Sequence, residues 1–160
     1  MKRFAILFAM AALSLPGNEL ILAEKGASNY VIAVSGAADT QSRAAAADFA
    51  GIFKEMTGIR LETVREDQVP AGKKVISIGN TTFAAKAGID ASKLNREEYI
   101  VRTAGDSLIL TGGKASGIRY SVYEFFEKAG KCEWFDGFTV QIPKTEKFVL
   151  PELNIRHVPD

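Results

Sequence analysis

Two strand-like segments separated by a three-residue turn limit the folds that are open to this chain. Residues 99–103 (Tyr-Ile-Val-Arg-Thr) and 107–111 (Ser-Leu-Ile-Leu-Thr) flank a turn at Ala104-Gly105-Asp106. A turn this short with a Gly-Asp pair joins neighbouring antiparallel strands. Any sheet that contains these strands is therefore mixed or antiparallel, and an all-parallel sheet is excluded.

A strand followed by a long amphipathic helix forms the second clear unit. Residues 30–34 are an apolar, β-branched run, and apolar residues at helical spacing follow it, with Asp39 or Thr40 as the N-cap and Gly58 as the C-terminal stop. Other elements are predicted as strands at 59–64, 73–78 and 138–143, a short helix at 82–87, and a second long helix at 118–129 that stops at Gly130. This order predicts an α/β (α+β) fold, a two-layer or three-layer sandwich of a mixed β-sheet with two main helices.

The first residues have the layout of a secretory signal peptide. Lys2 and Arg3 precede an apolar run over residues 4–15, and Ala23 offers a small residue for cleavage. The apolar run is shorter than the roughly 20 residues that cross a bilayer as a helix, so an uncleaved anchor is the weaker alternative. We predict a signal peptide at 1–23, a secreted or periplasmic location, and no membrane partner after cleavage.

The charge balance narrows the class of partner. The chain has 20 Lys and Arg against 19 Asp and Glu, and loss of Lys2, Arg3 and Glu19 with the signal peptide leaves 18 of each. A formally neutral domain lacks the excess of basic charge that nucleic-acid binding requires. We therefore expect no nucleic-acid partner.

The mature chain is predicted to contain one domain. Residues 24–143 hold all the predicted strands and helices, whereas residues 144–160 contain Pro151 and Pro159 and little periodicity, and are predicted to be a linker. Cys132 is the only cysteine, so an intramolecular disulfide is excluded and a small buried hydrophobe is expected there.

The residue types needed for hydrolytic chemistry are sparse. Zinc sites and Ser-His-Asp or Cys-His arrangements need more than one His or Cys, and this chain has only His157 and Cys132. Paired acids occur at Glu97-Glu98 and Glu124/Glu127, but the first pair points to opposite faces of a strand and the second lies on a solvated helix face. We predict no catalytic residue, no metal ligand and no cofactor in this chain.

The glycine-rich segment 112–117 (Gly-Gly-Lys-Ala-Ser-Gly) joins a predicted strand to a predicted helix. It matches neither the phosphate-binding pattern GxxxxGK[ST] nor the dinucleotide pattern GxGxxG. We interpret it as a turn that lets the helix pack closely on the sheet. Anion binding at the start of the helix is the alternative.

Aromatic and acidic residues meet in the segment after the second long helix. Trp134, Phe135 and Asp136, with Glu133 beside them, are candidates for contact with a glycan or with a neighbouring domain. A place in the core explains Trp134 and Phe135 equally well, and the two interpretations stay open.

Five segments, taken in order, carry a family resemblance: residues 53–58 (FKEMTG), 76–80 (ISIGN), 111–113 (TGG), 117–127 (GIRYSVYEFFE) and 130–135 (GKCEWF). Together they resemble the N-terminal domain of α-glucuronidases. They are also similar to the non-catalytic domain that precedes the barrel in β-hexosaminidases and related secreted bacterial glycoside hydrolases. The likeness covers residues 30–152.

The resemblance implies a β-hexosaminidase domain-2-like fold that packs against a catalytic (β/α)₈ barrel, in cis or in trans. The catalytic carboxylates would lie on that barrel, and residues 144–160 would be the linker toward it. We expect a secreted accessory domain of a polysaccharide-degrading glycoside hydrolase that acts on O-glycosyl bonds. The chain would be a truncated or a standalone form of this domain. Plant or microbial polysaccharide is expected as a further partner. A freestanding carbohydrate-binding module is the alternative.

Overall fold

A computed structural model of the chain describes residues 20–114, 116–135 and 140–159. The strands are β1 Leu20–Glu24, β2 Tyr30–Val34, β3 Thr63–Arg65, β4 Lys74–Ile78, β5 Tyr99–Ala104, β6 Ser107–Gly112, β7 Glu133–Trp134, β8 Val140–Gln141, β9 Lys147–Leu150 and β10 Asn154–His157. The helices are α1 Thr40–Thr57, α2 Thr82–Lys86 and α3 Gly117–Lys128, with 3₁₀ turns at Glu66–Gln68 and Ala91–Lys93.

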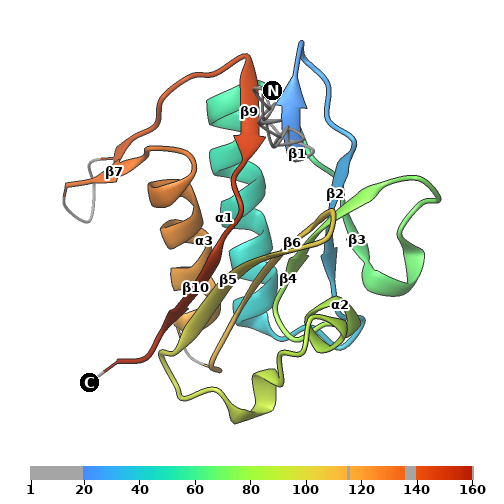
Figure 1. Cartoon of the computed structure of the whole chain (residues 1–160), viewed down its shortest axis with the longest axis vertical. Helices are drawn as coiled ribbons and strands as arrows, with labels where there is room; N and C mark the ends of the chain where they lie inside the picture. Colours follow the sequence, from blue (N-terminus) through green and yellow to red (C-terminus); the bar gives the residue numbers. More distant parts are fainter. Residues whose placement is uncertain (1–19, 115, 136–139, 160) are drawn as a thin grey trace, which may run out of the picture.

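Six strands form one mixed sheet in the order β10-β5-β6-β4-β2-β3 (Figure 1). β3, β2, β4 and β6 are parallel, whereas β5 is antiparallel to both β6 and β10. The predicted hairpin is β5–β6, and it forces the change of direction in the sheet. The predicted mixed α/β sandwich is therefore confirmed.

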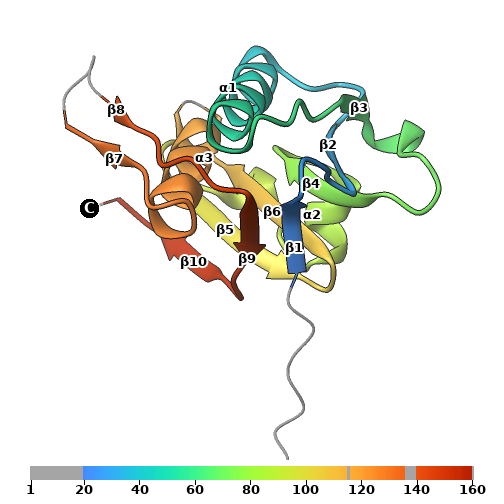
Figure 2. The same cartoon turned by 90° about the horizontal axis from the view of Figure 1, so that it is seen from above.

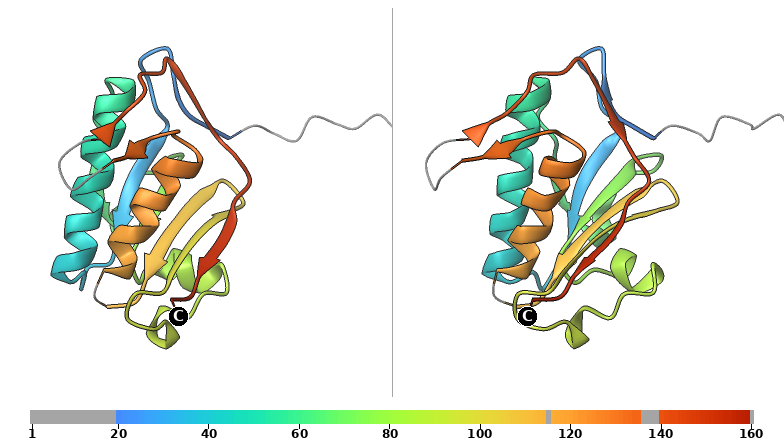
Figure 3. Two further views of the ribbon diagram at one scale, coloured as in Figure 1. Left: turned by 90° about the vertical axis from the view of Figure 1, so that its left-hand side faces the viewer. Right: turned by 60° about the vertical axis from the view of Figure 1, so that its left-hand side comes forward.

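Helices cover the sheet on both faces, which gives the three-layer form of the sandwich. Ile32, Ile76 and Leu108 lie in one row across β2, β4 and β6 and belong to the large core under α1 and α3. Ile100 and Ile109 belong to a smaller core on the opposite face, where α2 and the segment after it pack. Figure 3 shows α1 and α3 side by side, with α2 across the sheet from them.

The long helix α1 begins and ends where the sequence predicts. The Asp39 carboxylate accepts a hydrogen bond from the Ser42 backbone N–H at 2.8 Å, and Gly58 ends the helix at φ 76°, where glycine has no steric penalty. The buried face of α1 meets that of α3 through aromatic rings, with Phe49 at 4.8 Å from Phe126 and 5.6 Å from Phe125 between ring centroids.

The glycine-rich turn before α3 is shaped by close packing. A Cβ at Gly112 would lie 2.3 Å from the carbonyl carbon of Gly117, and one at Gly113 would lie 1.7 Å from the carbonyl oxygen of Asn95. The Gly113 N–H already donates to the carbonyl oxygen of Glu98 at 2.8 Å. These glycines are required because the helix and a neighbouring segment pack directly on the strand end, as the turn interpretation predicts.

The predicted linker at 144–160 differs most from the structure. β9 pairs antiparallel with β1, and β10 pairs antiparallel with β5 at the edge of the main sheet. Phe148 and Leu150 of β9 are 4% and 3% exposed. The prediction of irregular structure was wrong for these two strands, because each is only four residues long and its pairing partner is distant in the sequence.

Two predicted strands are shorter in the structure than in the sequence analysis. In the segment 59–64, Leu61 is buried, but ladder pairing with β2 begins only at Thr63. In the segment 138–143, β8 covers Val140–Gln141 and pairs with β7 alone. Residues 136–139 lie outside the described part of the chain.

Strand β1 overlaps the end of the predicted signal peptide. Leu22 and Ala23 are 0% and 1% exposed, within the large core, and β1 and β9 lie side by side (Figure 1). Cleavage after Ala23 would remove these two residues from the core, so the cleavage position stays a prediction.

Within the described ranges, no helix combines the length and the apolar character needed to cross a membrane.

Candidate functional site

Two of the predicted contact residues, Trp134 and Phe135, lie at the start of a short hairpin that follows α3. Gly130 sits so close to its neighbours that a Cβ would be 2.7 Å from both the Met56 methyl carbon and the Phe126 carbonyl oxygen. Lys131 then takes a positive φ of 57°, and this turn sends the chain into β7. Figure 2 shows the β7–β8 hairpin projecting beyond α3. Asp136 lies outside the described residues.

Trp134 anchors this hairpin to the body of the domain. Its half-buried ring packs against the large core and meets the Tyr123 ring edge-on at 5.2 Å. The Tyr123 hydroxyl donates to Asp48 of α1 at 2.9 Å, and Arg119 forms an ion pair with the same carboxylate at 2.7 Å. Burial, followed by the Asp48 hydrogen bond, raises the pKa of Tyr123, and hydrogen bonding to Asp48 raises the pKa of Arg119. Trp134 therefore packs on a ring that is hydrogen-bonded to α1, and it is itself partly a core residue.

Phe135 differs from Trp134, because 62% of its surface is exposed. Val140 on the opposing strand is also exposed, and the hairpin borders an open hollow of about 490 Å³ lined by Glu127, Lys131, Cys132, Glu133, Trp134 and Phe135. An exposed ring beside charged groups is suited to stacking on a sugar or to contact with another domain. The structure thus brings Trp134 and Phe135 together and gives them different surroundings.

Cys132, at the base of this hollow, is buried as the sequence predicts. Burial, followed by the charge of Glu55, raises the pKa of the thiol to about 11. A thiol with such a pKa is almost entirely protonated at neutral pH and is a poor nucleophile. Cys132 therefore acts as a small core residue.

The acids that the sequence analysis set aside have structural partners. Glu98 is 2% exposed and accepts hydrogen bonds from the Asn95 backbone N–H at 2.9 Å and from Arg156 of β10 at 2.7 Å. The Asn95 N–H, and then Arg156, lower the pKa of Glu98, so the carboxylate stays ionised in place. Glu124 accepts a hydrogen bond from the Tyr99 hydroxyl at 3.2 Å.

His157 belongs to β10, and its ring stacks on Tyr99 at 4.9 Å. The sequence analysis placed His157 in an irregular tail, and pairing with β5 overturns that placement.

Among the described residues, no group of three or more His, Cys, Asp or Glu side chains is placed to hold a metal ion.

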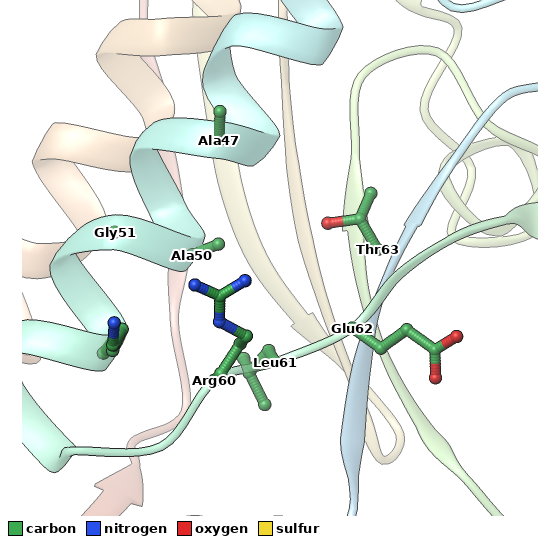
Figure 4. A pocket seen from close by; sticks show the side chains of 8 residues that line it. Ala47, Ala50, Gly51, Arg60, Leu61, Glu62 and Thr63 are labelled. Carbon is green, nitrogen blue, oxygen red and sulfur yellow. The ribbon is translucent and has the colours of Figure 1, made fainter.

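A second hollow, of about 590 Å³, lies between α1 and the segment that leads into β3 (Figure 4). Its helix side is formed by the short residues Ala47, Ala50 and Gly51 together with Lys54. Figure 4 shows the Arg60 guanidinium near Ala50 and the Glu62 carboxylate turned away from the helix. The charged groups do not converge, so this hollow offers no arrangement typical of catalysis.

A third hollow, of about 350 Å³, was not predicted as a whole from the sequence, although the glycine-rich segment 112–117 contributes to its lining. It lies at the carboxyl ends of β2, β4 and β6, and its lining includes Asp39, Ser42, Asn80, Ser92 and Lys114. These residues come from three separate stretches of the chain, 39–42, 80–92 and 114, which meet because the three strands are parallel. The available signal was that each of the three strands is followed closely by small and polar residues. We call this hollow the polar crevice.

No family model and no curated protein matches the sequence. Solved structures do match, among them BtGH115A, a family GH115 4-O-methyl-α-glucuronidase with specificity for decorated arabinogalactans. The TM-score is 0.56 and the identity 16%, over 88% of this chain and 18% of that one. The chain is therefore similar in fold to a small part of a much longer glycoside hydrolase.

Two further solved structures match at lower similarity. A GH138 enzyme targeting pectin rhamnogalacturonan II has a TM-score of 0.41 and 17% identity over 64% of this chain and 10% of its own. The protein CpGH84D has a TM-score of 0.42 and 12% identity over 59% of this chain and 17% of its own.

Proposed function

We propose that the chain is a secreted, non-catalytic accessory domain of a polysaccharide-degrading glycoside hydrolase of the α-glucuronidase or hexosaminidase type. In this proposal the domain packs against a catalytic (β/α)₈ barrel in cis or in trans. The observation that carries the proposal is the fold likeness to BtGH115A, which spans most of this chain but a small part of the enzyme. The supporting role beside a catalytic part rests on analogy between this fold and that part of the larger enzyme.

The position of β10 at the edge of the sheet determines where a barrel in cis would be attached. β10 is held to β5 along four residue pairs, ending with His157 opposite Tyr99. A barrel in cis would therefore follow an edge strand of the sheet directly. The exposed Phe135 and Val140 of the hairpin are a candidate contact surface for it.

The native protein tests this proposal. An antibody against the domain should detect, in the periplasm or the medium, either a polypeptide much larger than 17.3 kDa or a complex that copurifies with glycoside hydrolase activity. The purified 160-residue chain should leave aryl glycosides and glucuronoxylan fragments intact. Hydrolysis by this chain at enzymatic rates, or a free cytoplasmic 17.3 kDa protein with no associated hydrolase, would contradict the proposal.

A freestanding carbohydrate-binding module is the second candidate, and the exposed Phe135 ring beside the open hollow favours it. Calorimetric titration with xylan and chitin oligomers tests this function. Heat that disappears in Phe135→Ala would support it. Absence of heat with every glycan would remove it.

A further inference from the structure

The polar crevice lies at a point where neighbouring parallel strands lead to opposite faces of the sheet. After β2 the chain enters α1, which packs in the large core, whereas after β4 it enters α2, which packs in the smaller core on the other face. Because the two connections diverge, a crevice opens between them above the strand ends. Open α/β sheets bind ligands at this kind of position.

Ser42 gives the crevice a feature that packing alone does not explain. The residue is 5% exposed and lines the crevice, and its hydroxyl makes no hydrogen bond with any residue in the described ranges. The backbone N–H of Ser42, by contrast, is satisfied by Asp39. The hydroxyl therefore keeps its donor and its lone pairs available to a ligand or to water in the crevice.

Gly79 keeps the space beside this hydroxyl open. It has a φ of 88°, and a Cβ at this position would lie 2.6 Å from the Ser42 Oγ. Any side chain at residue 79 would therefore be strained and would press against the hydroxyl.

The remaining polar groups present both donors and acceptors. Lys114 and Asn80 are exposed at the crevice, and neither side chain bonds to another described residue. Asp39 contributes a carboxylate, of which one oxygen is used by the helix N-terminus. The Ser92 hydroxyl donates to Asp90 at 2.5 Å and keeps its lone pairs available. Ile118 and Ala38 add apolar surface to the lining.

We propose that the polar crevice binds a neutral, hydroxyl-rich ligand of mono- or disaccharide size. Each sugar hydroxyl both donates and accepts, which matches a lining of hydroxyl, amide, ammonium and carboxylate groups, and the C–H faces of a sugar ring suit Ile118. A phosphate would face the Asp39 carboxylate, and the Gly113 N–H that would bind it is already engaged with Glu98. The volume of about 350 Å³ lies in the range of roughly 300–1,000 Å³ typical of ligand pockets.

Amide chemical shifts of the ¹⁵N-labelled 160-residue chain test this site. The titrants are xylose, galactose, xylobiose and cellobiose, with inorganic phosphate as the anionic comparison. At least one neutral sugar should shift the amides of Ser42, Gly79 and Asn80 in a saturable way. Saturation by phosphate alone, or no shift with any neutral sugar at high millimolar concentration, would overturn the proposal.

Two variants give the test its specificity. Ser42→Ala should weaken sugar binding about five- to tenfold, the loss expected for one hydrogen bond. It should leave the melting temperature of the free protein nearly unchanged, because the hydroxyl bonds to no described residue. Phe135→Ala, in the hairpin after α3, should leave the affinity unchanged. A Ser42→Ala protein that binds as the parent does, or sugar-induced shifts that Phe135→Ala abolishes, would contradict the assignment. The outcome is independent of whether the domain serves a catalytic barrel.

Discussion

The β7–β8 hairpin and the strands β9 and β10 are close in sequence but are attached to the domain in opposite ways. Each strand of the hairpin is two residues long. In the hairpin, Trp134 packs against the large core, whereas Phe135 is exposed. Phe148 of β9, by contrast, lies among Phe53, Phe125 and Phe126 at centroid distances of 6.0, 5.9 and 6.4 Å. A phenylalanine thus belongs to the surface in one segment and to the core in the next.

This difference separates the part of the chain that supports the fold from the part that is free to make contacts. Removing β9–β10 withdraws a core aromatic ring and an edge strand, whereas changing Phe135 alters an exposed surface. The effects on stability are therefore expected to differ by several kcal/mol, and the following changes measure that difference.

Truncation after Pro143 should have the largest effect. The shortened chain loses Phe148, Leu150 and the strand that covers β5, so it should lack a cooperative thermal transition by circular dichroism and calorimetry. A chain ending at His157 is the control and should melt like the full chain. If the chain ending at Pro143 unfolds at the same temperature as the control, β9 and β10 are not part of the folded unit.

Phe148→Ala should destabilise the domain by about 3–5 kcal/mol, the range for truncating a buried phenylalanine. Urea denaturation measures the change in the free energy of unfolding. A loss below about 1 kcal/mol would mean that the ring cluster can collapse around the cavity.

Removal of β1 should have a slightly smaller effect, because ordering entropy is recovered when a terminal strand is lost. A variant that begins at Glu24 loses buried Leu20 and Leu22, and should be about 2–4 kcal/mol less stable than one that begins at Leu20. Mass spectrometry of exported protein then decides between a mature N-terminus after Ala23, as the sequence predicts, and one before Leu20, as the burial of Leu20 and Leu22 favours. A mature chain that starts at Glu24 with undiminished stability would contradict the role of β1.

Glu98 should make the attachment of β10 sensitive to acid. Its folded-state pKa lies below the ordinary 4.5, so its stabilising contribution is complete above pH 4.5 and is lost as the pH falls through the lowered value. Glu98→Gln should be less stable than the parent at neutral pH and lose less stability on acidification. Chemical denaturation of both proteins at several pH values measures this, and parallel curves would show that the Glu98–Arg156 pair is not coupled to folding.

Phe135→Ala should have the smallest effect, within about 0.5 kcal/mol, because the side chain is mostly exposed. The same urea measurement as for Phe148 gives a matched comparison of two phenylalanines. A loss of about 2 kcal/mol or more would place Phe135 in the folding core and weaken its candidacy as a contact residue.

Local signals made the centre of the fold predictable. The Asp39 cap, the Gly58 stop and the β5–β6 turn each act within a few residues, so the sequence alone identifies α1 and the hairpin. The strand β10 has no such signal, because Ile155 and Arg156 are fixed by Val101 and Glu98, which are distant in the sequence. For the same reason the prediction of irregular structure at 144–160 was wrong for β9 and β10.

The candidate sites show the same contrast between local sequence signals and contacts that join distant parts of the chain. Trp134 and Phe135 stand out in the sequence as adjacent aromatics, but their difference in burial depends on Tyr123 and the core and was not visible there. The polar crevice combines residues from three strand ends, and Ser42 is recognisable only through its burial. A local pattern therefore identified the residues of the hairpin site, whereas at the crevice it marked only the glycine-rich segment 112–117, of which Gly112 and Lys114 are part of the lining.

Native-state hydrogen exchange tests most directly whether the fold extends through β10 while the hairpin remains peripheral. The Thr103 N–H, which donates to the Leu153 carbonyl oxygen at 2.8 Å, and the amides of the β10–β5 ladder should exchange only through global unfolding, with the same free energy as the core of β4 and β6. The paired amides of β7 and β8 should exchange through local opening at a much lower free energy. Equal, low protection of β10 and of the hairpin would contradict this account.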